Sequence, residues 1–372
     1  MKVARVEAFG LPYAEPNDHG NMRSICMVKV TTDDGAVGWG EAVTLFDEAT
    51  RATLSIVQGL ESHVVGIEAT PRAVREAIQG RVWWYGSSGI ATFAAAAIDI
   101  ALWDLQGRAQ GQSLADLLGG TVHDSLPTIT SCHATLSDID EMADVMAGWV
   151  GAAESSGIKV GFGKAGLANL GFDRTRDVAF VRSLRSALGD DARIMIDIGA
   201  RIHWTVDEAI DRTRAFEECA IDWIEEPLGA DDPAGYALLK AATSTRIAYG
   251  EREWTVRGIE RIVDTGTVDV VGIDPGRAEG ITGFSQAAAF IAARDVQANA
   301  HAFAGPVTYA ASLALSLTSR ACKQLEVPPY LNQLYEIVGL PDRPEGGRVR
   351  VSTVPGLGLE VDEKAVRKHA WA

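Results

Sequence analysis

The feature that most constrains this chain is a series of short apolar runs in its second half, separated by segments with helical periodicity. Between about residues 126 and 321 the runs read PTITSC, IKVGF, RIMIDIG, IDWIEEP, RIAYGE, VDVVGID and VQANAHA. Segments such as VDEAIDRTRAFEECA and VRGIERIVDTG lie between them. Strand alternating with helix is typical of βαβ units around a parallel sheet. At least seven such units predict a (β/α) barrel.

The two ends of the chain have a different pattern. Residues 1–40 alternate apolar and polar positions around the turn Asp33-Asp34-Gly35, which predicts antiparallel strands. The polar stretch from Ala14 to Arg23 between them predicts a mobile loop, and helical patterns follow to about residue 118. Near the other end, RVRVSTVPGLGLEVDE predicts further strands that return to the N-terminal domain.

Ionisable side chains end nearly every predicted strand of the second half. They are Lys159, Asp197, Glu225, Glu251, Asp274, His301 and Glu326. From Asp197 onward the intervals are 28, 26, 23, 27 and 25 residues, about one strand–helix unit each. Catalytic groups of a (β/α) barrel lie at the carboxyl ends of its strands. One such carboxylate can merely cap a helix or face water, but a whole series in register indicates a shared site.

The acids of this series suit a hard metal ion. Asp197, Glu225 and Glu251 would repel one another and raise their pKa values unless a cation neutralised them. Oxygen ligands of this kind favour Mg²⁺, with Mn²⁺ as a substitute. Bound Mg²⁺ can accept a substrate carboxylate and stabilise the enediolate formed when the α-proton leaves. Asp274 and His301 could form a dyad, in which the carboxylate fixes the imidazole tautomer and raises its basicity.

Composition excludes several other classes of protein. The chain has 34 Lys+Arg against 50 Asp+Glu, and a net charge of −16 argues against nucleic acid or an anionic membrane as a partner. Its four cysteines are far apart and form no Cys-x-x-Cys, which fits a reducing cytoplasm. The N-terminus lacks a signal-peptide core, and the most apolar window, Gly89–Leu105, is too short to span a bilayer. We therefore expect a soluble, cytoplasmic protein.

Taken together, these motifs resemble the mandelate racemase-like subgroup of the enolase superfamily over nearly the whole chain. The matching elements are Gly38-Trp39-Gly40-Glu41, IDIALWDLQGRAQGQSLADLLGG, IEEPL, GERE, DPGRAEGIT and PGLGLEVDE. The resemblance implies a (β/α)₇β barrel over residues 124–344 and an α+β capping domain built from residues 1–123 and 345–372. It also implies a homo-oligomer and a small anionic hydroxy-acid or sugar-acid substrate.

The same resemblance implies roles for the strand-end residues. Mg²⁺ would bind Asp197, Glu225 and Glu251, the Asp274–His301 dyad would act as base or acid, and Glu326 would hydrogen-bond the substrate near its carboxylate.

The second predicted strand departs from the family pattern. Many members carry Lys-x-Lys there, and the second Lys is a base on the face opposite the His. Here residues 158–164 read IKVGFGK. If Lys159 takes the first position, the second is Gly161 and that base is missing. If the strand is shifted, Lys159 could itself be the base, or Lys164 could reach in from the loop. We favour Lys159 as an electrostatic partner or base, and Lys164 is otherwise a solvated loop lysine.

This departure bears on the reaction. Racemisation needs acid–base groups on both faces of the α-carbon, whereas one His can serve both steps of a syn elimination. The sequence therefore predicts dehydration of an aldonate or aldarate to a 2-keto-3-deoxy acid. A racemase, epimerase or cycloisomerase of a hydroxy-carboxylate on the same site is the alternative.

Loops of the capping domain are expected to set specificity. By analogy with the family, Tyr13–Arg23 and Thr44–Thr50 would close over the barrel mouth. Arg23 and His19 could contact a distal carboxylate or hydroxyls of the substrate, and His203 is a further candidate for polyol contact.

Two interpretations of the sequence from other classes of protein remain. The run from Gly161 to Gly166 fits G-x-G-x-x-G after a strand, which by itself suggests an NAD-dependent oxidoreductase. That reading leaves the strand-end acids and His301 unexplained. A barrel kept as a non-catalytic binding protein is the second reading, and an intact Asp274–His301 pair argues against it.

Overall fold

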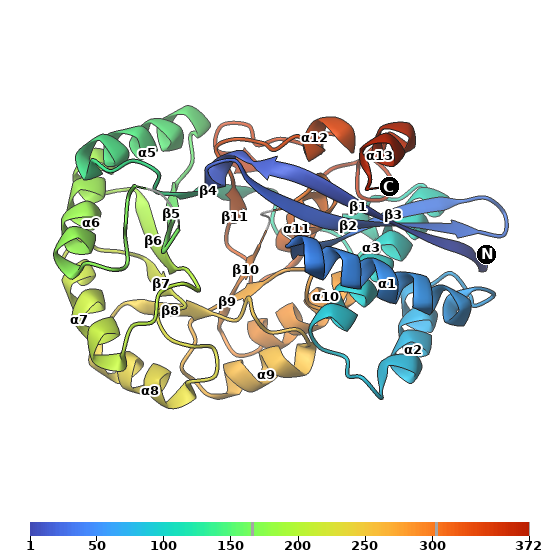
Figure 1. Ribbon diagram of the computed structural model, residues 1–372, viewed down its shortest axis with the longest axis horizontal. Helices are drawn as coiled ribbons and strands as arrows, with labels where there is room; N and C mark the ends of the chain where they lie inside the picture. Colours follow the sequence, from blue (N-terminus) through green and yellow to red (C-terminus); the bar gives the residue numbers. More distant parts are fainter. Residues whose placement is uncertain (165–166, 302–303, 372) are drawn as a thin grey trace.

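The computed structural model describes residues 1–164, 167–301 and 304–371, which fold into a cap and a barrel (Figure 1). The cap contains a three-stranded antiparallel sheet in the order β1 (Val3–Glu15), β2 (Asn21–Thr32) and β3 (Val37–Leu45). Three helices follow it in the chain: α1 (Asp47–Val64), α2 (Pro71–Val82) and α3 (Ile90–Gln110).

Glycines in β3 allow α3 to approach the cap sheet closely. A Cβ atom placed on Gly40 would lie 1.8 Å from the carbonyl oxygen of Ala97, and one on Gly38 would lie 2.0 Å from that of Ala101. Helix α3 is long and apolar enough to cross a membrane by length and composition, but most of its residues are buried within the protein. It contacts both the cap sheet and helix α10 (Gly280–Ala292), which is the environment of a core helix.

Eight parallel strands form the barrel predicted from the sequence. They are β4 (Leu126–His133), β5 (Gly157–Phe162), β6 (Arg193–Ile198), β7 (Trp223–Glu225), β8 (Arg246–Tyr249), β9 (Val270–Ile273), β10 (Gln297–Ala300) and β11 (Leu325–Val327). The hydrogen-bonded order runs from β10 back to β4 and then to β11. A parallel bridge between Ala298 and Cys322 joins β10 to the segment before β11. The strands and their intervening helices confirm the (β/α)₇β fold.

The helices that connect these strands lie on the outside of the barrel (Figure 1). They are α5 (Ile139–Ala153), α6 (Arg174–Leu188), α7 (Val206–Glu217), α8 (Pro233–Ala242), α9 (Val256–Asp264), α10 and α11 (Pro306–Thr318). Five of them begin after a side chain that accepts a hydrogen bond from a backbone N–H of the first turn, which stabilises a helix N-terminus. These capping residues are Asp138, Asp173, Thr205, Asp232 and Thr255.

An apolar cluster fills the inside of the barrel. It contains Ile129, Met195, Trp223, Ala248 and Val270, each from a different strand. Met195 and Trp223 lie two residues before Asp197 and Glu225, so this layer lies directly beneath the polar side chains of those strands.

The hairpin between β1 and β2 differs from the mobile loop that we expected. Its turn is a short 3₁₀ helix, η1 (Pro16–Asp18), and Glu15 accepts a hydrogen bond from the backbone N of Asn17 at 3.0 Å. The Asn17 amide donates to the carbonyl of Tyr330 at 2.7 Å and accepts from its backbone N at 3.1 Å. The hairpin is thus attached to the segment that follows β11.

The end of the chain also differs from the expected strands. Only β12 (Arg348–Val349) forms, and it pairs antiparallel with the start of β4. Gly356 and Gly358 then have positive φ angles of 69° and 74°, which a strand does not accommodate. Helix α13 (Glu363–His369) packs against β1. Two four-residue helices, α4 (Leu114–Leu117) and α12 (Leu334–Ile337), complete the fold.

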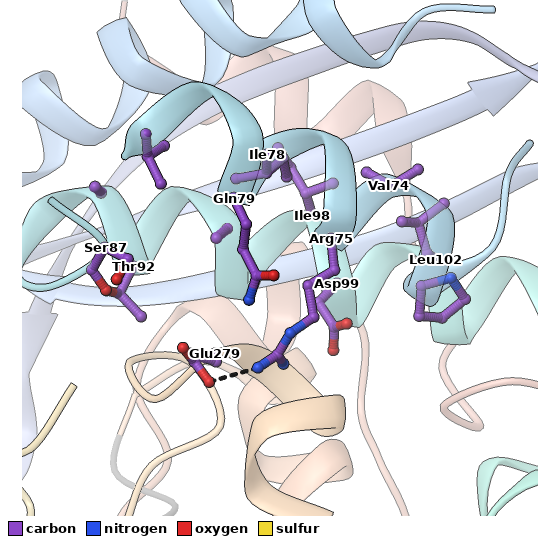
Figure 2. Close-up of a pocket in the computed structure, with 14 residues that line it drawn as sticks. Val74, Arg75, Ile78, Gln79, Ser87, Thr92, Ile98, Asp99, Leu102 and Glu279 are labelled. Atoms are coloured by element: carbon purple, nitrogen blue, oxygen red, sulfur yellow. Dashed lines mark hydrogen bonds and ion pairs between the residues drawn. The ribbon is translucent and has the colours of Figure 1, made fainter. Parts of the chain in front are cut away.

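Charged side chains join the cap to the barrel at a pocket between α2, α3 and the start of α10. Arg75 of α2 forms an ion pair with Glu279 at 2.7 Å, as Figure 2 shows. Asp99 of α3 accepts a hydrogen bond from the backbone N of Thr282 at 2.9 Å. The pocket is lined by none of the strand-end residues singled out in the sequence, and we assign it a structural role.

Candidate active site

The residues predicted from the sequence lie at or next to the carboxyl ends of the barrel strands, except Lys159, which lies in the middle of its strand. Lys159, Asp197, Glu225 and Glu326 belong to β5, β6, β7 and β11. Asp274 and His301 directly follow β9 and β10, and Glu251 follows β8 after one intervening residue. Because the strands are parallel, these ends meet at one mouth of the barrel.

Lys159 lies at the centre of the acidic residues. Its Nζ atom is 3.0 Å from Glu225 Oε2, 3.0 Å from Glu326 Oε1 and 3.5 Å from Asp197 Oδ2. Burial alone would lower the pKa of Lys159, but the surrounding carboxylates raise it well above the usual value. A lysine held in its charged form is a poor proton acceptor. In this structure Lys159 is the electrostatic partner of Glu225, Glu326 and Asp197.

The acids outnumber the cations in this cluster. Burial, followed by the charges of neighbouring acids, raises the pKa of Asp197 and raises that of Glu225 well above its usual value, although Lys159 opposes both shifts. Burial also disfavours the charged form of Glu326, but Lys159 and His301 hold its pKa below the usual value. One lysine thus does not neutralise the group, and a divalent cation would.

Glu251 lies close to this group because Gly272 of β9 has no side chain to separate them. A Cβ atom placed on Gly272 would lie 3.5 Å from Glu251 Cβ and 3.8 Å from Glu225 Oε1, so both acids converge over this position. Among the described residues, no three His, Cys, Asp or Glu side chains already surround a metal-sized space. The oxygen donors and the excess negative charge nevertheless fit Mg²⁺, and binding requires Asp197, Glu225 and Glu251 to turn toward a common point.

The Asp274–His301 pair lies next to these acids, since the charge of His301 acts on both Glu251 and Glu326. His301 Nδ1 lies 2.7 Å from Asp274 Oδ2, and Asp274 Oδ1 accepts a hydrogen bond from the backbone N of Gly276 at 2.7 Å. Ser312 of α11 donates to the His301 carbonyl at 2.7 Å. Burial opposes the imidazolium form, but the hydrogen bond and charge of Asp274 raise the pKa of His301 above its usual value. Because an ionised carboxylate only accepts hydrogen bonds, this contact fits a proton on Nδ1.

Helix α11, which follows His301 in the chain, is held by a cap residue that the sequence analysis did not single out. Glu41 of β3 accepts hydrogen bonds from the backbone N atoms of Gly305, Val307 and Thr308 at 2.7, 3.2 and 3.4 Å. Burial raises the pKa of Glu41 to about 7. Glu41 therefore connects the cap sheet to the His301 side of the mouth.

The predicted lid residues separate into two groups. Arg23 is buried and forms an ion pair with Asp18 at 2.6 Å, and Lys164 Nζ lies 3.9 Å from the same carboxylate. Turn η1, which contains Asp18, contacts strand β4 at the mouth. In contrast, His19 and His203 are exposed, and within the described part of the chain no hydrogen bond or ion pair joins either of them to the strand-end residues.

The second expected lid segment, Thr44–Thr50, is partly buried. Thr44 Oγ1 donates to the carbonyl of Ser24 at 3.1 Å, and both Thr44 and Thr50 are inaccessible to solvent. These two threonines therefore stabilise the start of α1.

Two polar residues on the inner face were missed by the sequence analysis. Trp223 donates from Nε1 to Glu225 Oε2 at 3.2 Å, and Asn299 donates from Nδ2 to Glu326 Oε1. Each lies two residues before a strand-end residue, Trp223 before Glu225 and Asn299 before His301. Because side chains of a strand alternate between its faces, counting back by two would have found both.

The dinucleotide-binding reading gains no support from the backbone. Gly166, the last glycine of the G-x-G-x-x-G match, lies outside the described residues. The next helix, α6, begins at Arg174, well beyond the position at which such a motif opens its helix.

Comparison with known proteins agrees with this architecture. Residues 141–365 match the family described as enolase C-terminal domain-like, and residues 18–119 match the mandelate racemase/muconate lactonizing enzyme N-terminal domain. The chain belongs to the mandelate racemase-like subgroup of the enolase superfamily.

Similar proteins of this superfamily act on sugar acids. The chain is 30% identical over 380 residues to a D-galactonate dehydratase of Ralstonia nicotianae, covering 98% of this chain and 94% of that one. A 3,6-anhydro-D-galactonate cycloisomerase of Zobellia galactanivorans has a TM-score of 0.89 at 25% identity, with full coverage of both chains. A mandelate racemase/muconate lactonizing protein of Paracoccus denitrificans, complexed with magnesium, has a TM-score of 0.86 at 29% identity, covering 99% and 96%. These relatives support a sugar-acid dehydratase or cycloisomerase.

Proposed function

We propose that this protein is a Mg²⁺-dependent dehydratase that converts an aldonate or aldarate to a 2-keto-3-deoxy acid. The observation that carries the proposal is the Asp274–His301 contact of 2.7 Å at the same barrel mouth as the acids around Lys159. This arrangement places a proton-transfer group beside a site for a carboxylate and its counter-ion.

The metal site would be formed by Asp197, Glu225 and Glu251. When bound, Mg²⁺ supplies a Lewis acid that draws electron density from the substrate carboxylate as the α-proton leaves. Lys159 adds a fixed positive charge next to the same position, because its pKa is raised by the acids around it. A cationic centre of this kind is needed, since the chain as a whole carries a net charge of −16 and the substrate is itself an anion.

His301 would exchange protons with the substrate. The hydrogen bond from Nδ1 to Asp274 orients the ring and stabilises its protonated form, so Nε2 can hold a proton near the leaving hydroxyl group. Glu326 is held by Lys159 and Asn299, which keeps a carboxylate acceptor beside the substrate carboxylate. Arg23 and Lys164, both next to Asp18, would face the distal end of the substrate.

Cycloisomerisation or epimerisation on the same residues is the second candidate. The TM-score of 0.89 to a cycloisomerase favours it, because the two chains align over their whole length. Both reactions begin with loss of the α-proton and differ in whether a hydroxyl group then departs.

The four cysteines of the chain are all buried thiols without disulfides, which supports a reducing location such as the cytoplasm.

A library of mono- and diacid sugars, assayed with Mg²⁺ for keto-acid formation and for exchange of the α-proton in D₂O, tests the proposal. We expect the wild type to form a keto acid from at least one member and His301→Asn to form none. Exchange without keto acid would reject dehydration in favour of epimerisation or cycloisomerisation. Neither product nor exchange from any member would reject the proposed function.

A further inference from the structure

A second histidine occupies the position at which β5 lacks a side chain. Gly161 lies two residues after Lys159, so it belongs to the same, inward face of the strand. It is in register with Asp197 on one side and with His133 on the other. A Cβ atom placed on Gly161 would lie 2.2 Å from His133 Nδ1 and 2.6 Å from its Cε1. The imidazole ring therefore lies directly over the inner face of β5.

This ring belongs to the barrel mouth. His133 is the last residue of β4, the first barrel strand. Two residues earlier, Ser131 hydrogen-bonds to Glu326 of β11, which shows that this face of β4 points inward. Strand β11 separates β4 from β10 around the barrel, so His133 and His301 approach the mouth from different strands with Glu326 between them.

The charges around His133 differ from those around His301. Burial lowers the pKa of His133 well below its usual value. The charges of Lys164, Arg23 and Lys159 lower it further, and Asp18 opposes them. His133 is therefore held as the neutral imidazole, which can accept a proton. His301 bears the contact with Asp274 that favours its protonated form. Two titratable groups whose environments differ in this way are suited to opposite roles as acid and base.

We propose that His133 is the second acid–base residue of this site, acting on the reacting carbon from the Gly161 side while His301 acts from the β10 side. The assignment rests on the proposed function. In the elimination, His133 accepts the α-proton, and the electron pair of the C–H bond forms the new double bond. Protonated His301 gives its proton to the departing hydroxyl group, which leaves as water. The enol product then becomes the keto acid. His133 releases the proton that it accepted, and His301 takes up one proton from solvent, which restores both rings.

Two histidine variants test this division of roles with the same sugar-acid library in D₂O. His133→Asn is expected to lose keto-acid formation and α-proton exchange together, by about 10²- to 10⁴-fold, which is the usual contribution of general acid–base catalysis. His301→Asn is expected to lose keto-acid formation but to retain exchange, since the residue that removes the α-proton is intact.

A glycine variant moves the ring without changing any ionisable group. Gly161→Ala adds a Cβ atom where the His133 ring lies, so the ring must shift, and we expect at least a tenfold loss of turnover. Gly148→Ala in α5 is the matched control, because a Cβ atom there meets nothing within 4 Å. Melting temperatures with and without Mg²⁺ should match the wild type in His133→Asn, which would show that the fold and the acid cluster are intact.

The outcomes separate this inference from the proposed function. Turnover by His133→Asn within threefold of an active wild type would overturn the role of His133 and leave the dehydratase proposal standing. Loss of exchange in His301→Asn, with exchange retained in His133→Asn, would also overturn it. A wild type that neither exchanges nor converts any sugar acid would reject the proposed function, and with it the role assigned to His133.

Discussion

The two sides of the barrel mouth carry the same residue type in opposite electrostatic settings. On the β9–β10 side, His301 contacts Asp274, and its pKa is raised. On the β4–β5 side, His133 lies over Gly161 near Lys164, and its pKa is lowered. Burial acts on both rings in the same direction, toward the neutral form. The difference therefore comes from neighbouring charges. Asp274 contacts His301 directly, whereas His133 lies among three cations and one carboxylate, Asp18.

Removing the carboxylate of Asp274 should have the largest effect on the difference between His301 and His133. In Asp274→Asn the ring keeps a hydrogen-bonding neighbour but loses the charge that stabilises its protonated form, and we expect kcat to fall about 10³-fold. Steady-state keto-acid formation measures this loss. Exchange of the α-proton should persist if His133 removes it. A kcat within tenfold of the wild type would show that Asp274 does not control His301.

Glu41, which holds α11 on the His301 side, should make stability depend on pH. Its pKa is raised from 4.5 to about 7 in the folded protein, so the folded state binds its proton more tightly than the unfolded state does. Its contribution is greatest below pH 4.5 and decreases as pH rises to 7, by about 3 kcal/mol at 1.36 kcal/mol per pKa unit.

Urea unfolding of the wild type and Glu41→Gln across this range checks the prediction. We expect the free energy of unfolding of the wild type, measured relative to that of Glu41→Gln, to decrease as pH rises from 4.5 to 7. A constant difference over that interval would show that Glu41 does not titrate there.

Mg²⁺ should stabilise the group of acids that lies between the two histidines. A ligand at 100 times its Kd adds about 2.7 kcal/mol to the free energy of unfolding. Thermal unfolding with Mg²⁺ and with EDTA should therefore differ by a few degrees in the wild type. Glu225→Gln should remove most of the difference, while Glu218→Gln, in an exposed ion pair with Arg182, should retain it. An unchanged Mg²⁺ response in Glu225→Gln would place the metal elsewhere.

Removing the charge of Lys164 should have the smallest effect of these changes, and the effect should be on His133. Its charge lowers the pKa of His133, so Lys164→Met should raise that pKa toward the usual value. NMR titration of labelled histidine rings measures the shift, with His133→Asn identifying the signal and Lys323→Met as a surface control. A pKa of His133 that stays constant or falls in Lys164→Met would show that the charge of Lys164 does not lower it.

The barrel and most of the acid cluster could be predicted because their signals are local. Each apolar run ends close to the residue that the structure places at the mouth, as Glu225 at the end of β7 and His301 directly after β10 show. Spacing of about one strand–helix unit then brings these residues together, because parallel strands share a carboxyl end.

His133 itself could have been found in this way, but its position over β5 could not. The first apolar run, PTITSC, stops one residue before it, so the strand-end rule applied to that run would have made it a candidate. Its position over Gly161 depends on the register between β4 and β5, which is a long-range property. The same limit applies to the β1–β2 hairpin, since the polar residues from Ala14 to Arg23 are ordered by partners such as Tyr330, more than 300 positions away.

The contact between the two ends of the chain has a consequence for the order of folding. The ring of Trp371 packs where Gly10 of β1 has no side chain, its backbone N donates to the Gly10 carbonyl at 3.0 Å, and Arg51 lies 4.4 Å over the ring. Strand β1 leaves the ribosome early, but this face of it stays uncovered until residue 371 has been synthesised. The barrel strands emerge in between and can pair with their neighbours in turn. Strand β1, which precedes the barrel strands in the chain, is thus completed after them.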